Sequence, residues 1–161
     1  MTPGRAPEPA DADPLAVWSA LGTVYQGVLH DIVSVLAEQA GMDSGVFSAL
    51  AYLERADPPH RMGMSELQRH LHPRYSQPGL SRLVSRMEAD GLVERRRDPG
   101  DGRAAVLVST NQGRGAYARA NAVYTAAVNE HFGRHLTRSE STGLAAALSR
   151  VGERRVEREP H

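Results

Sequence analysis

One segment limits the possible folds more than any other: an amphipathic helical pattern that begins at Ser76 stops at Gly91 and is followed by two strand-like runs. Ser76 is a favourable N-cap, and Pro78 lies in the first turn, where a proline is tolerated. Residues 92–97 and 104–109 have the composition of strands, and the Asp, Pro and Gly residues between them favour a turn. The segment therefore predicts a helix followed by a β-hairpin with a charged tip.

Helical patterns lie on both sides of this segment. Apolar residues recur at three- and four-residue steps in 14–40 and in 111–135, which predicts two long amphipathic helices. Thr110 is expected to cap the helix at 111–135. Further helices are expected after the capping sequences Asp43, Ser65 with Gln68, and Thr137 with Glu140. The predicted fold class is mainly α with a small β-hairpin wing: a winged helix-turn-helix with long N- and C-terminal helices.

The length of 161 residues suits a single domain. We expect this domain to span residues 14–155, with a winged helix-turn-helix lobe at 43–109. The helices at 14–40 and 111–155 carry more apolar surface than one small lobe can cover. A partner surface is therefore expected on them.

Both ends of the chain are expected to lie outside the domain. Residues 1–13 are rich in Pro, Ala and acidic residues and predict a disordered N-terminal tail, and residues 156–161 predict a frayed C-terminal tail. The opening stretch lacks the basic start and apolar run of a secretory signal. No window approaches the roughly 18 apolar residues that a membrane-spanning helix requires. We expect a soluble, cytoplasmic protein without membrane contact.

Charge is distributed unevenly along a chain whose net charge is zero. Residues 61–103 contain nine Arg and six acidic residues, whereas the remainder of the chain is net acidic. A neutral total argues against a protein that coats nucleic acid indiscriminately, but the middle of the chain carries a positive field. The predicted helix-turn-helix and hairpin lie within this basic part.

The helix after Ser76 has two different faces. At about 100° per residue, one arc is apolar and suited to packing, while the opposite arc carries small polar residues and Arg. Arg82 or Arg86 can make a bidentate contact to guanine, and Gln77 can pair with adenine. The helix is therefore predicted to lie in the major groove of DNA. The apolar arc consists of Leu80, Leu83, Val84 and Met87.

The predicted hairpin adds positive charge beside this helix. Its arginines suit contacts to the phosphate backbone and insertion of one Arg into the minor groove. Helix and hairpin together describe a winged helix that binds double-stranded DNA. The hairpin arginines are Arg95, Arg96, Arg97 and Arg103.

The order and sequence of these segments resemble the MarR (multiple antibiotic resistance regulator) family of transcription regulators. The resemblance is carried by 65–71, 76–91, the Leu92-Val93-Glu94-Arg95-Arg96 run and 98–104, and it extends over most of the chain. It implies a DNA-binding transcriptional regulator, with repression as the usual mode.

The resemblance also assigns roles in the wing. The Asp-x-Arg pattern of the family places an Arg in the minor groove, held by the Asp, which assigns these roles to Asp101 and Arg103. Gly102 between them departs from the larger residue that is common there. With the helix residues, the expected DNA-binding set is Ser76, Gln77, Gly79, Ser81, Arg82, Ser85, Arg86, Arg97, Asp101 and Arg103.

Two further properties follow from the resemblance. The family forms homodimers through the helices at 14–40 and 111–155, so two recognition helices would read a palindrome with half-sites about one helical turn apart. Family members often bind small aromatic or phenolic effectors between the dimer helices and the DNA-binding lobe. The candidate ligand-binding residues here are Trp18, Tyr25, His30, Phe47 and Tyr117, for which a place in the core is the alternative.

Two other kinds of site were weighed. His131 and His135 lie four residues apart, a spacing that can chelate a metal on a helix, but two histidines without carboxylates or cysteines are insufficient. Gly113-x-Gly115-x-x-Ala118 partly matches a dinucleotide fingerprint, but no parallel strand is predicted after it. We therefore expect no metal, no cofactor and no enzymatic activity.

The alternative function is a winged-helix module that docks another protein without specific DNA recognition. A protein-docking face would favour apolar anchors over the Ser and Arg residues of the outer arc. The residues of the outer arc favour DNA.

Overall fold

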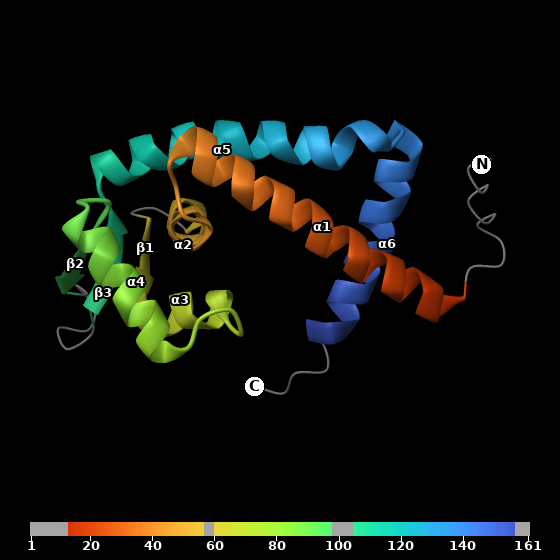
Figure 1. The fold of residues 1–161 in the computed structure, drawn as a ribbon. Helices are drawn as coiled ribbons and strands as arrows, with labels where there is room; N and C mark the ends of the chain where they lie inside the picture. Colours follow the sequence, from red (N-terminus) through yellow and green to blue (C-terminus); the bar gives the residue numbers. More distant parts are fainter. Residues whose placement is uncertain (1–12, 57–59, 98–104, 157–161) are drawn as a thin grey trace. The chain divides into compact units, whose positions relative to one another are not determined.

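The computed structural model describes residues 13–56, 60–97 and 105–156. Its contacts divide the chain into two compact units, one of Val33–Ala127 and one of Met1–Ile32 with Val128–His161. Helix α1 (Pro14–Ala40) and helix α5 (Asn111–His131) each contribute residues to both units. Figure 1 shows the order of the elements along the chain.

The Val33–Ala127 unit has the predicted winged-helix elements. Its helices besides α1 and α5 are α2 (Ser44–Arg55), α3 (Met64–Leu71) and α4 (Gln77–Ala89). Two strands follow α4, and they pair in antiparallel fashion with Val93 opposite Ser109. The predicted helix-then-hairpin segment is thus confirmed. The two strands are β2 (Val93–Arg97) and β3 (Ala105–Ser109).

A third strand, β1 (Arg61–Gly63), was not predicted. It pairs with the other side of β3, which gives a three-stranded antiparallel sheet in the order β1-β3-β2. Three residues are too few to show the alternation that identifies a strand in a sequence. Pairing with β3 defines this segment, with Arg61 opposite Val108, Met62 opposite Leu107 and Gly63 opposite Val106.

Most of the expected helix caps are confirmed. The Asp43 carboxylate accepts hydrogen bonds from the amides of Gly45 and Val46, and the Ser76 hydroxyl accepts one from Gly79. Thr110 caps α5 in the same way, with a Gly113 N–Oγ1 distance of 2.9 Å. These bonds satisfy amides that lack partners at helix starts, and they fix where each helix begins.

The expected capping box of α3 is wrong. The helix begins at Met64 with Gly63 at the N-cap, and no side chain caps it. Ser65 is exposed, and Gln68 donates from Nε2 to the carbonyl oxygen of Tyr75 at 2.6 Å. The Gln68 side chain therefore bonds to the turn after α3 and does not cap the start of that helix.

The core of the Val33–Ala127 unit lies between the helices and the sheet. Leucines from four helices and a strand are almost fully buried there, and the aromatic rings at the edge pack against them. Burial of this apolar surface is the main stabilisation of the unit. The largest buried side chains are Leu36, Leu50, Leu53, Leu67, Leu80, Met87, Leu107 and Val84.

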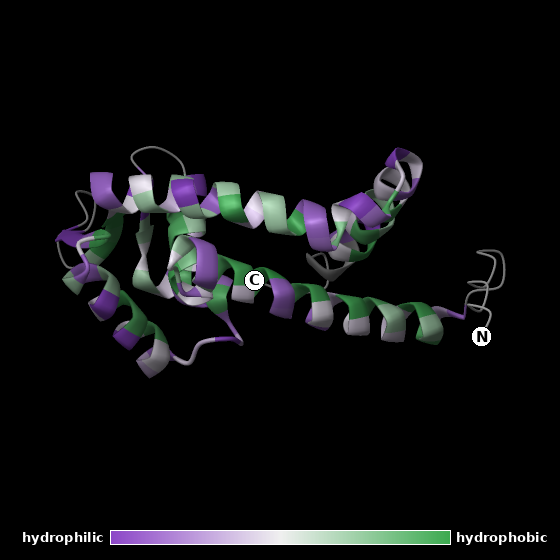
Figure 2. Cartoon of the chain, turned by 45° about the horizontal axis from the view of Figure 1, so that its top comes forward, coloured by the Kyte–Doolittle hydropathy of each residue, from purple (hydrophilic) through white to green (hydrophobic). Residues whose placement is uncertain are grey.

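The second unit consists of helices and exposes apolar side chains. It contains the first part of α1, the end of α5, a short 3-10 turn at Gly133–His135 and α6 (Arg138–Val156). Among the described residues of this unit, only Ile32 belongs to the buried apolar set. Figure 2 shows the hydrophobic residues that run along α1. The exposed large apolar residues are Leu15, Val17, Trp18, Leu21, Val24, Tyr25, Leu148 and Val151.

Helix α1 also corrects the expectation that no segment approaches a membrane span. By length and composition it is a candidate span, with a mean hydropathy of 1.2 over 18 residues, of which 11% are buried. Scattered polar residues such as Gln26 and His30 interrupt a continuous apolar run in α1, but the mean hydropathy of the helix remains high. The finding establishes that α1 is a long apolar helix with an uncovered surface.

Candidate nucleic-acid interface

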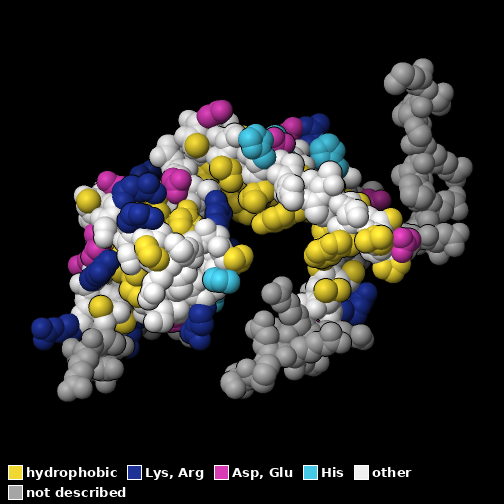
Figure 3. All heavy atoms as spheres, turned by 60° about the horizontal axis from the view of Figure 1, so that its bottom comes forward, with side chains coloured by type: hydrophobic (Ala, Val, Ile, Leu, Met, Phe, Trp, Pro, Cys, Tyr) yellow, Lys and Arg dark blue, Asp and Glu magenta, His cyan; other side chains and the backbone are white. Residues whose placement is uncertain are grey.

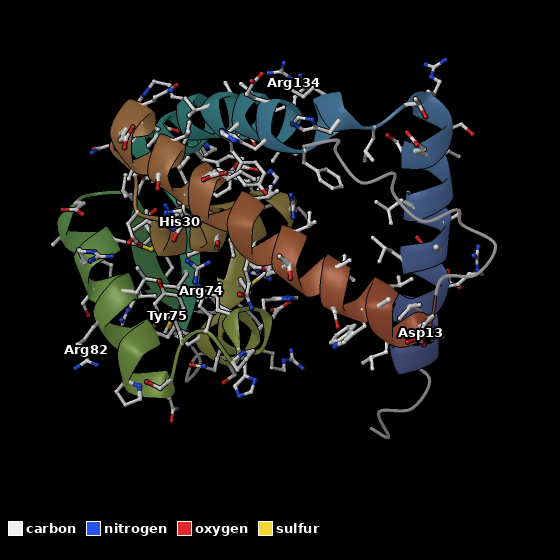
Figure 4. All side chains as sticks on the ribbon, turned by 45° about the vertical axis from the view of Figure 1, so that its right-hand side comes forward. Asp13, His30, Arg74, Tyr75, Arg82 and Arg134 are labelled. Carbon is white, nitrogen blue, oxygen red and sulfur yellow. The ribbon has the colours of Figure 1, made fainter. Side chains whose placement is uncertain are left out.

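Helix α4 separates an apolar face from a polar one, as its sequence predicts. Leu80, Leu83, Val84 and Met87 are at most 4% exposed and form the packing face. Figure 4 shows Arg82 extending away from the helix on the other side, and Figure 3 shows basic side chains on the surface of this unit. The exposed residues of α4 and its cap that were predicted to bind DNA are Ser76, Gln77, Ser81, Arg82, Ser85 and Arg86.

Gly79 has a packing role at the start of α4. A β carbon at this position would lie 3.2 Å from the Ser76 hydroxyl oxygen and 3.7 Å from the Tyr75 ring. A larger side chain would crowd the cap that begins the helix. The glycine therefore serves the helix start itself, in addition to the close approach to DNA that was predicted for it.

The turn before α4 is attached to the start of α2. Tyr75 lies over Gly45, where a β carbon would be only 1.9 Å from the tyrosine hydroxyl. The Arg74 guanidinium donates to the hydroxyl of Ser44, the first residue of α2. Figure 4 labels Arg74 and Tyr75 in this turn. These contacts fix where α4 begins relative to α2.

Arg74 was missed by the sequence analysis as a member of this basic surface. It is exposed and lies two residues before the N-cap of α4, so its charge is held near the start of the helix. A basic residue two positions before a predicted N-cap is the signal that identifies it. The long-range contact with Ser44 has no local signature.

Arg86 is held by an acidic side chain from another helix cap. Its Nη2 lies 3.5 Å from Oδ1 of Asp43, and both side chains are about half exposed. The same Asp43 oxygen accepts the amide hydrogen bonds that begin α2. Among the described residues, Arg82 has no ion-pair partner. The two arginines that were predicted to read guanine therefore differ in their surroundings.

The strand that follows α4 carries three consecutive arginines, two of which are paired. Arg95 lies 3.0 Å from Glu88 of α4, and Arg96 pairs with Glu94 of the same strand. Arg97, which was predicted to bind DNA, is exposed at the end of β2. The predicted wing residues Asp101 and Arg103 lie outside the described residues.

The five candidate ligand residues do not form one described cluster. Phe47 of α2 stacks on Tyr117 of α5 with ring centroids 5.6 Å apart, and also on Tyr124 at 4.8 Å. Phe47 is buried and Tyr117 half-buried, as in a core. The remaining candidates, Trp18, Tyr25 and His30, are exposed on the part of α1 that belongs to the other unit.

The two alternative motifs have ordinary structural surroundings. Helix α5 ends at His131, so His135 lies in the following 3-10 turn and the two histidines do not share a regular helix face. His131 Nδ1 lies 3.5 Å from Asp31, and the described residues contain no group of three potential metal ligands. Gly113 follows β3, whose two neighbouring strands are both antiparallel, so the parallel unit of a dinucleotide site is missing there.

Comparison with known proteins finds a family model that is similar to part of this chain. Residues 40–104 match the model of the MarR family. No curated protein sequence matches the chain.

Solved structures of MarR family proteins have the same fold. AbsC, a MarR family transcriptional regulator from Streptomyces coelicolor, has a TM-score of 0.76 and 23% identity, and the match covers 96% of this chain and 100% of that chain. Sco3205 from the same organism, solved in complex with DNA, has a TM-score of 0.74 and 24% identity over 89% and 91% of the two chains. The transcriptional regulator BldR from Sulfolobus solfataricus has a TM-score of 0.67 and 26% identity over 84% and 94%.

Proposed function

We propose that this chain, whose residues 40–104 match the MarR family model, is a transcriptional regulator that binds double-stranded DNA sequence-specifically as a homodimer on a palindromic operator. The exposed arc of α4 is the observation that carries the proposal. A helix in the major groove needs polar and cationic side chains on its outer face and a buried opposite face that fixes its orientation. Helix α4 meets both requirements.

Within this proposal, phosphate contacts and base contacts come from different residues. Arg82 and Gln77 lie on the outer face of α4, where they can contact base edges. Arg74, at the start of that helix, and Arg97, at the end of β2, suit phosphate contacts that position the protein without reading sequence. Asp101 and Arg103 keep their proposed roles in the wing.

The homodimer is supported by the uncovered apolar surface of the second unit. Trp18 and Tyr25 are 72% and 63% exposed, and the described part of this unit has almost no buried core. An apolar surface of this extent is unfavourable in water and marks an interface. We propose that residues 14–40 and 111–155 supply the dimer interface and that 43–109 is the DNA-binding lobe, in a cytoplasmic protein.

We further propose that the protein is a repressor that a small aromatic or phenolic molecule releases from DNA. Phe47 and Tyr117 supply stacked rings at one candidate site, and Trp18, Tyr25 and His30 supply others on α1. A ligand can release the protein only if it binds the DNA-free arrangement more tightly than the DNA-bound one. The effector would therefore have to distinguish two spacings of the recognition helices.

The experiment is selection of genomic DNA fragments by the purified full-length protein at two salt concentrations, followed by sequencing of the retained DNA. Enrichment of one palindromic site would support a sequence-specific regulator. Retention of no fragment above background by a folded dimer would contradict the proposal. That result would favour the alternative, a winged-helix module that docks another protein.

A further inference from the structure

The pairing of Arg86 with Asp43 places a negative charge beside the recognition helix. Asp43 is the N-cap of α2, and Arg86 lies near the end of α4. The pair therefore joins two helices through residues that are 43 positions apart in the sequence. With Oδ1 engaged by two amides and by Arg86, the carboxylate is held in a fixed position. The same carboxylate therefore caps α2 and connects it to α4.

This arrangement affects DNA binding because Arg86 cannot contact DNA freely while it remains paired. A phosphate or a guanine that recruits Arg86 must compete with the Asp43 carboxylate. A random sequence offers phosphates alone, whereas a correct site can add a bidentate contact to guanine. Any contact of Arg86 with DNA must therefore offset the loss of this ion pair, and the full cost applies wherever the DNA recruits Arg86 completely.

We propose that Asp43 tunes DNA affinity through Arg86: it restrains this arginine and thereby weakens binding to any DNA that recruits it. The inference rests on the proposed DNA-binding function and deepens it. It also makes Arg82, which has no ion-pair partner among the described residues, the principal base-reading arginine.

Asp43→Asn tests the inference because it separates charge from capping. Asn and Asp are equally good N-caps, so α2 should keep its start while the ion pair is lost. Glu130→Gln is the matched control, since it removes one negative charge from an exposed pair, that with Arg134, in the other unit. Arg86→Ala and the Asp43→Asn/Arg86→Ala double variant complete a cycle.

The measurement is the dissociation constant, over a series of salt concentrations, of full-length protein for a random-sequence duplex and for the site that the wild type retains. Asp43→Asn should bind the random duplex about two- to fivefold more tightly at low salt, the range for release of one exposed ion pair. For this variant, the plot of the logarithm of the binding constant against the logarithm of the salt concentration should have a slope steeper by about 0.9 than that of the wild type, as expected for one more phosphate contact. Binding to the selected site should tighten by at least as much if Arg86 contacts it, because the same ion pair is given up there.

Three results would overturn the inference. The first is equal binding of the random duplex by Asp43→Asn and Glu130→Gln. The second is an effect of Asp43→Asn that persists undiminished in the Arg86→Ala background, which would mean that Asp43 acts on DNA by its own charge. A lower thermal midpoint with weaker binding to both duplexes would show a structural role. Each of these is distinct from failure of the proposed function, in which the wild type itself binds neither duplex.

Discussion

Gly113 of α5 packs directly against the carbonyl oxygen of Leu92, such that a β carbon on Gly113 would lie 2.0 Å from that oxygen. Leu92 connects α4 to β2, and its carbonyl also accepts the amide of Thr110, the residue that caps α5. One carbonyl group therefore joins the start of α5 to the connection between α4 and β2. The absence of a side chain at residue 113 is what permits this contact.

Gly113→Ala should destabilise the protein by about 1–3 kcal/mol, the usual range for overpacking, because the obstacle is backbone that must shift. Gly115→Ala is the matched control in the same helix, where the nearest atom is the end of the flexible Arg119 side chain, 3.5 Å away. That control should be neutral or stabilising, since Ala favours helix. Urea unfolding compares the two, and equal stability would contradict the packing argument.

Opposite faces of α4 should respond differently to the same new charge. Leu83→Asp buries an unpaired carboxylate in the core and should unfold the DNA-binding lobe. Ser81→Asp places the same group on the exposed face and should leave the thermal midpoint within a few degrees of wild type while abolishing DNA binding. Thermal unfolding and a DNA mobility shift make the comparison. An unchanged midpoint for Leu83→Asp would show that the faces are assigned wrongly.

Arg82→Ala should relax base preference at one position of the selected site, at a cost of about 1–3 kcal/mol in binding to that site. Binding to a random duplex should fall much less, because phosphate contacts remain. Arg134→Ala, an exposed arginine of the other unit, serves as the control and should leave base preference unchanged. Repeating the fragment selection with each variant gives the measurement. Retention of the wild-type preference by Arg82→Ala would remove this residue from base recognition.

Trp18→Glu should weaken the proposed homodimer. Large aromatic residues commonly dominate interface energies, and a charge at this position would have to be buried without a partner. We expect the dimer dissociation constant to rise by about tenfold or more. Gln26→Glu adds the same charge at another exposed position of α1 and should have a smaller effect. Sedimentation at several concentrations measures both, and an unchanged dimer in Trp18→Glu would exclude this part of α1 from the interface.

The capping box of α6 predicts a pH effect. The Glu140 carboxylate accepts hydrogen bonds from the backbone amide and from the side-chain hydroxyl of Thr137. These bonds lower the pKa of Glu140 from its ordinary 4.5, and the amide has the larger effect. Because the folded pKa is the lower one, the stabilisation is present above pH 4.5 and is lost as pH falls through the folded pKa. A carboxyl titration followed by NMR should place this pKa below 4.5, and Thr137→Ala should return it part of the way. A wild-type value of 4.5 or above would contradict the assignment.

The elements with local signatures could be predicted from the sequence. The buried and exposed faces of α4 follow from helical periodicity, and the starts of α2, α4 and α5 follow from Asp43, Ser76 and Thr110, whose side chains bond amides only two or three residues away. The MarR family match to residues 40–104 agrees with this local pattern.

Contacts between distant segments were decided only by the tertiary structure. Strand β1 is defined by its pairing with β3, in which Met62 lies opposite Leu107. Gln68 bonds the carbonyl oxygen of Tyr75 instead of capping α3. The restraint of Arg86 by Asp43 likewise spans 43 residues. Periodicity and capping report interactions within a few residues, whereas these contacts depend on how the helices and strands pack.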